Sequence, residues 1–104
     1  MSKSLTTTKK KFPPVHPGEL LKQDLEDIDV SMNALARAIS VPSGRIVQIV
    51  NGKRGISAET ALRLGFYFGT SAEYWMNLQK KYELETAQDQ MATRIQREVL
   101  PRTA

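Results

Sequence analysis

The stretch from residue 32 to residue 54, MNALARAISVPSGRIVQIVNGKR, constrains the fold of this chain more than any other. Its apolar residues recur at helical spacing in two short runs, which are separated by Ser40-Val41-Pro42. Ala36 is small enough to let two helices approach closely, and Pro42 suits the start of a new helix. Two short helices that cross steeply at a tight turn form a helix-turn-helix. We therefore predict helices over residues 32–39 and from residue 42 or 43 to residue 50.

Three further helices are predicted around this unit. Pro17 sets the backbone angle of a first helical turn, and the helix that it opens runs to about residue 28. Ser57 begins another helix, which ends at Gly69. Thr70 and Glu73 fit a capping box, with Thr70 as the N-cap of a last helix. No segment has the alternating period of a strand, so the fold class is all-α, with five helices.

The chain divides into three parts. Residues 1–15 are rich in Ser, Thr and Lys, which predicts a disordered basic arm. Residues 16–84 form the predicted helix-turn-helix domain, and residues 85–104 extend its last helix. This last helix continues with an apolar stripe made of Leu84, Ala87, Met91, Ile95 and Val99. A five-helix domain leaves little for the stripe to pack against, so the extension either pairs with another subunit or frays.

Charge is distributed unevenly along the chain. The net charge is +4, and residues 41–56 contribute +3 without a single acidic residue, whereas residues 17–40 carry −3. A basic, acid-free segment over the second half of a helix-turn-helix is what nucleic-acid binding requires. The run Lys9-Lys10-Lys11 either contacts phosphates or is a solvated tail.

The sequence has no metal-ligand spacing and no nucleophile motif. It has one His and no Cys in 104 residues, which excludes a disulfide framework, a cysteine-ligated zinc and a thiol nucleophile. The carboxylates of the first helix lack an enclosed site that would separate their pKa values, so they are interpreted as a solvated face. No apolar run approaches the roughly 18 residues of a membrane span. We expect a soluble cytoplasmic protein that is not an enzyme and has no cofactor and no metal.

Residues 32–68 resemble the XRE/Cro-type helix-turn-helix, which implies a five-helix bundle of the phage-repressor (lambda repressor-like) type. A longer segment, about residues 16–84, resembles a HigA-type antitoxin. The motifs that carry this resemblance are His16-Pro17-Gly18-Glu19, Asn51-Gly52-Lys53-Arg54, Thr60-Ala61-Leu62-Arg63-Leu64 and TSAEYWMNLQ from Thr70 to Gln79. The first and last of these are the more specific, because a helix-turn-helix does not need them to bind DNA.

The resemblance implies a homodimer that represses its own operon by binding a palindromic operator in double-stranded DNA. It also implies a protein partner, a HigB-type toxin that cleaves mRNA, which the antitoxin neutralises. The alternative is a stand-alone regulator of the phage-repressor kind with no toxin. Dimers would form through the last helix or through the globular domain.

The same resemblance assigns the DNA contacts. The base-reading residues lie on the second helix of the motif and are Ser43, Gly44, Arg45, Val47 and Gln48. Phosphate contacts fall on the helix N-terminus at Ser31 and on the loop residues Asn51, Lys53 and Arg54. The chain departs from the pattern at Ser40, where many helix-turn-helices have Gly. A serine there requires either a left-handed backbone or a different turn.

Overall fold

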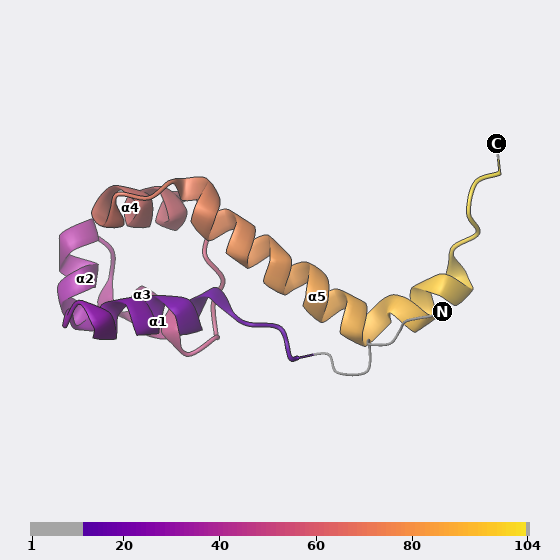
Figure 1. Cartoon of the computed structure of the whole chain (residues 1–104), viewed down its shortest axis with the longest axis horizontal. Helices are drawn as coiled ribbons and strands as arrows, with labels where there is room; N and C mark the ends of the chain where they lie inside the picture. The colour runs from indigo at the N-terminus through magenta and orange to yellow at the C-terminus, as the bar shows by residue number, and fades with distance from the viewer. Residues whose placement is uncertain (1–11, 104) are drawn as a thin grey trace.

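The computed structural model describes residues 12–103 of the chain (Figure 1). Its five helices are α1 (Pro17–Asp27), α2 (Met32–Ile39), α3 (Ser43–Val50), α4 (Ala58–Phe68) and α5 (Ala72–Glu98). The described residues contain no strand, and the predicted all-α class is confirmed. The lysine run at residues 9–11 and most of the predicted basic arm lie outside the described residues.

Serine hydroxyls fix where three of these helices begin. Each accepts a hydrogen bond from the backbone N–H three residues later, and the three are Ser31, Ser57 and Ser71. The predicted N-cap at Thr70 is therefore wrong. The Thr70 N–H donates to the Gly65 carbonyl at 3.0 Å, so Thr70 belongs to the end of α4, where Gly69 is left-handed. α5 begins one residue later than the capping-box pattern predicted.

A single hydrophobic core joins α1–α4 to the first turn of α5. It consists of Leu21, Leu25, Leu35, Ala36, Ile39, Ile46, Ile49, Ile56, Ala61, Leu64 and Trp75. Trp75 is 1% exposed and is the largest side chain of this core. Ile46 and Ile49 are fully buried and hold the inner face of α3 against the other helices, leaving its outer face for other contacts.

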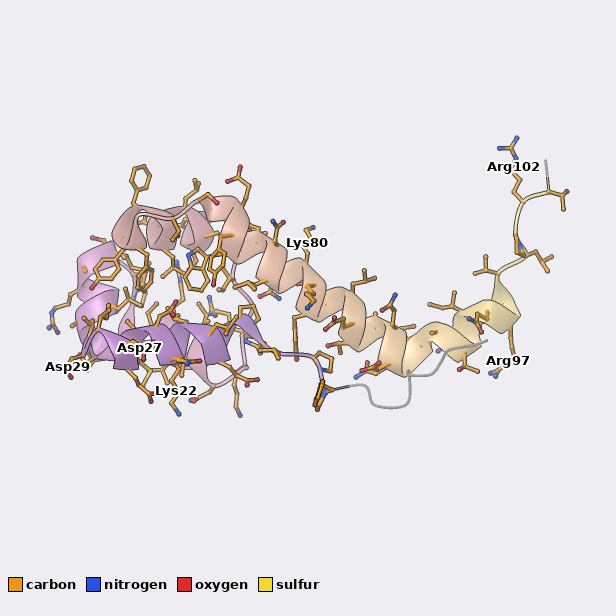
Figure 2. The ribbon with its side chains drawn as sticks, viewed as in Figure 1. Lys22, Asp27, Asp29, Lys80, Arg97 and Arg102 are labelled. Carbon is orange, nitrogen blue, oxygen red and sulfur yellow. The ribbon has the colours of Figure 1, made fainter. Side chains whose placement is uncertain are left out.

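The second half of α5 projects beyond this core (Figure 1). The radius of gyration is 17.5 Å, well above the roughly 13 Å of a compact chain of this length. Figure 2 shows Lys80 where α5 leaves the globule and Arg97 near the helix's far end. No described helix, this one included, combines the length and apolar character needed to cross a membrane.

Candidate nucleic-acid interface

The turn between α2 and α3 is built on a left-handed serine. Ser40 has φ 59° and ψ 49°, so the left-handed alternative holds for this position. The Val41 N–H donates to the Ala36 carbonyl at 3.0 Å and the Ser40 N–H to that of Arg37 at 3.3 Å, which closes α2. This conformation costs a serine about 1 kcal/mol. α3 can then start at Ser43, directly after Pro42.

The outer face of α3 is open at the helix's first turn. Ser43, Gly44 and Gln48 are exposed. A Cβ built on Gly44 would meet no atom within 4 Å, so packing inside the protein does not require a glycine there. A close approach of the backbone to DNA would explain why residue 44 is a glycine, and so would neutral sequence drift.

Arg45 and Val47 are only partly exposed, and Arg45 is drawn towards α4. Its Nη1 lies 3.7 Å from Glu59 Oε1. Glu59 also binds Arg63 Nη2 at 3.0 Å, and Arg63 Nη1 donates to the Ile39 carbonyl at 2.9 Å. The acid-free segment of the sequence is therefore not acid-free in space. The sequence signal for this contact is Glu59, which lies in the first turn of α4, just beyond the acid-free residues 41–56.

The loop after α3 is basic and exposed, and it is tied back to the helix. The Lys53 N–H donates to the Gln48 carbonyl at 2.8 Å, and Arg54 Nε donates to Gln48 Oε1 at 2.9 Å. Gly52 has φ +75°, the left-handed conformation that glycine favours at the end of a helix. Asn51, Lys53 and Arg54 are all exposed. Side chains that could bind bases and phosphates are thus held next to each other.

Ser31 is also exposed, at the N-terminus of α2. Its Oγ accepts the Ala34 N–H at 3.0 Å, so a phosphate at this site would be bound through the hydroxyl proton and the neighbouring backbone N–H groups.

The segments that flank the helix-turn-helix in sequence contact it in space. A Cβ on Gly18 would lie 1.8 Å from the Ile49 carbonyl oxygen, so only glycine lets α1 approach α3 this closely. His16 is the N-cap of α1: its Nδ1 accepts the Gly18 N–H at 2.9 Å, and its ring packs edge-on against Tyr82, with centroids 4.8 Å apart. Burial lowers the pKa of His16, and Glu19 offsets part of this effect. Motifs that a DNA-reading helix does not itself need therefore support it.

Fold and surface together define a helix-turn-helix protein of the phage-repressor type, and comparison with known proteins identifies its family. A scan against models of protein families finds no match. The HigA-family addiction module antidote protein from Coxiella burnetii is 42% identical, with a TM-score of 0.85 over 88% of this chain and all of that one. The Pseudomonas aeruginosa antitoxin HigA, solved with the higBA promoter, is 47% identical with a TM-score of 0.83 over 86% of this chain and 99% of that one. Virulence-associated protein I of Dichelobacter nodosus is 44% identical over 94 residues, which are 88% of this chain and 87% of that protein.

This chain belongs to the HigA family of antitoxins. The resemblance inferred from the flanking motifs is confirmed.

Proposed function

We propose that this chain is a repressor of its own operon that binds a palindromic operator as a homodimer. The observation that carries the proposal is the exposed surface made by the first turn of α3 and the basic loop behind it. Its backbone is held by the turn at Ser40 and by the Gln48 hydrogen bonds, so it is formed before DNA arrives. The Pseudomonas relative was solved with promoter DNA, which supports the same role here.

In this proposal α3 lies in the major groove, and its N-terminal residues contact base edges. Gln48 presents an amide that can pair with adenine, and Ser43 and Gly44 allow close approach. Arg45 reaches a base only if it leaves the weak 3.7 Å pair with Glu59, and Val47 contributes apolar contact. Phosphate contacts fall to Ser31, Asn51, Lys53 and Arg54, which makes the affinity salt-dependent.

The second copy of the chain is proposed to bind through the distal part of α5. Leu84, Met91 and Ile95 share one face of this helix, Val99 is its C-cap, and all four are 38–61% exposed. An apolar stripe on a projecting helix is buried when a second such helix packs on it. A twofold dimer would place two α3 helices about 34 Å apart, in successive major grooves. Residues 85–104 would then be the dimerising extension of the domain formed by residues 16–84.

The second proposed partner is a HigB-type toxin, an mRNA endonuclease that the antitoxin neutralises in the cytoplasm. Membership of the HigA family supports it, and the role is one of binding rather than catalysis. Co-expression with the neighbouring reading frame tests it: a complex of the two products supports the antitoxin role. The absence of such a reading frame would favour the stand-alone regulator.

Footprinting on the promoter region of the chain's own gene tests the repressor role. We expect the protein to protect a palindrome whose half-sites lie one turn of the DNA helix apart, and we expect this protection to be lost as the salt concentration is raised. Uniform binding without a footprint would contradict it.

A further inference from the structure

Gln79 is a buried polar side chain on α5 that faces the loop following α3. It is 6% exposed. Its Oε1 accepts the Ile56 N–H at 2.8 Å, and its Nε2 donates to Glu83 Oε2 at 2.9 Å. A buried backbone N–H that lost this acceptor would be left unpaired, which is strongly unfavourable. The amide is therefore fixed at both ends.

The loop backbone passes directly against this amide. A Cβ on Gly55 would lie 2.7 Å from Gln79 Nε2 and 3.0 Å from Gln79 Cδ, so glycine is what allows the contact. Ile56, the next residue, is 2% exposed and anchors the loop in the core. On its other side the loop is held by the Lys53 N–H bond to the Gln48 carbonyl. Lys53 and Arg54 thus lie between two fixed points, α3 and Gln79.

We propose that Gln79 is a positioning residue for phosphate binding: by holding Ile56 and Gly55 it fixes the loop that presents Lys53 and Arg54. The proposal rests on the proposed DNA-binding function. A loop without this anchor has to be ordered when DNA binds, and the entropy lost in ordering it weakens binding. Because Gln79 lies on α5, the same contact sets the loop's position relative to the helix proposed to join two protomers.

The test compares Gln79→Leu with Gln23→Leu, a matched change on the exposed surface of α1. The probes are a fluorescent duplex of the gene's own promoter region and a mixed-sequence duplex of equal length. We expect Gln79→Leu to weaken binding to both duplexes about tenfold, and Gln23→Leu to change neither. Each lost phosphate contact should also reduce the slope of log K against log salt by about 0.9. A smaller folded fraction would lower the active concentration but leave this slope unchanged.

Two further variants keep the test informative if Gln79→Leu folds poorly. Gly55→Ala should weaken binding in the wild-type background and add nothing in a Gln79→Ala background, because its methyl group then has no amide to displace. Exchanging the pair, Gln79→Glu with Glu83→Gln, retains an acceptor for the Ile56 N–H. We expect the DNA affinity of this double variant to lie within about threefold of wild type, unlike that of Gln79→Leu.

The outcomes separate this inference from the function on which it rests. If the wild-type chain binds neither duplex, the proposed DNA-binding function fails. The positioning role alone is overturned if wild type binds and Lys53→Ala weakens binding while Gln79→Leu and Gly55→Ala leave affinity and salt slope at wild-type values.

Discussion

Between residues 21 and 75 most large apolar side chains of this protein pack into one core, with Leu62 and Phe66 among the exceptions on the surface, whereas beyond residue 83 the large apolar side chains are all exposed. Leu64 and Trp75 are at most 1% exposed, but Leu84 and Val99 are 61% and 57% exposed. Both sets recur at helical intervals, the first mainly on α1–α4 and the second along α5 as far as its C-cap Val99. The difference is that α1–α4 enclose the first set, and no described element covers the second.

This contrast separates two proposed properties of the chain, contact with DNA and association with a second copy. The proposed DNA-contacting surface is held by contacts within the protomer: Gly18 against Ile49, Ser40 in the turn, and Gln79 against Ile56. The proposed dimerisation depends on the distal part of α5, whose apolar face lacks contacts of that kind within the protomer. Substitutions in the two regions should therefore change different measurements.

The largest expected effect is loss of stability on truncating the core at α5. Trp75→Ala removes a side chain that is 1% exposed, and we expect it to lower the free energy of unfolding by about 4 kcal/mol. Tyr74→Ala, next to it and 43% exposed, is the control and should cost less than about 1 kcal/mol. Denaturant unfolding measures both. Equal losses would show that α5 is not anchored at Trp75.

An acidic residue in the apolar stripe on the distal part of α5 should weaken dimerisation and leave the free energy of unfolding of the protomer unchanged. Met91→Glu is expected to shift a dimer to monomers, raising the dimer dissociation constant at least about tenfold. Thr93→Glu, on the opposite face of α5, should leave assembly unchanged. Sedimentation velocity at several concentrations distinguishes the two variants. If Met91→Glu remains dimeric, the globular domain joins the protomers.

On the proposed DNA surface, loss of a base contact should weaken binding mainly to the operator, whereas loss of a phosphate contact should weaken binding to any DNA sequence. Gln48→Ala should weaken binding to the operator about tenfold and binding to mixed-sequence DNA less, because it removes a base contact as well as the acceptor of the Arg54 Nε–H. Lys53→Ala should weaken both duplexes alike and reduce the salt slope by about one per protomer. Lys22→Ala is the control, since Lys22 points outward from α1 (Figure 2). Equal effects of Gln48→Ala on both duplexes would remove Gln48 from the base-reading set.

The helices and most of their ends could be predicted from sequence because their signals are local. Periodic apolar residues and the caps at Ser31 and Ser57 act within one or two turns. The prediction at Thr70 was wrong because the ending of α4 at Gly69 engages the Thr70 N–H, and Ser71 caps α5 instead.

Contacts between helices could not be predicted in this way. Gln79 binds a backbone N–H 23 residues away, and Arg45 pairs with a carboxylate on the next helix. Both depend on how the helices cross, which a one-dimensional pattern does not contain. The base-reading and phosphate-binding assignments remain predictions for the same reason: they depend on how DNA is docked.

A smaller effect is expected at the turn that orients α3. Ser40→Gly relieves the left-handed strain of a non-glycine residue, and we expect it to stabilise the fold by about 1 kcal/mol. Ser43→Gly, at the first residue of α3, is the control and should not stabilise the fold. Thermal unfolding compares them. A neutral Ser40→Gly would mean that interactions of the serine side chain already offset the strain.

The smallest expected effect is a dependence of stability on pH at the start of α1. Burial lowers the pKa of His16 in the folded state, where its Nδ1 must stay unprotonated to accept the Gly18 N–H. Because the unfolded chain then takes up the proton more readily, the stability that His16 contributes is complete above its usual pKa of about 6.5. It falls as the pH drops from there through the lower folded pKa.

His16→Asn keeps an N-cap acceptor and has no titrating ring, so its unfolding free energy should fall less between pH 7.5 and 5.5. Burial, and then Asp27, raise the pKa of Asp24, but Asp24 is present in both proteins and its contribution cancels in the comparison. Identical pH profiles for the two would show that protonation of His16 does not oppose folding.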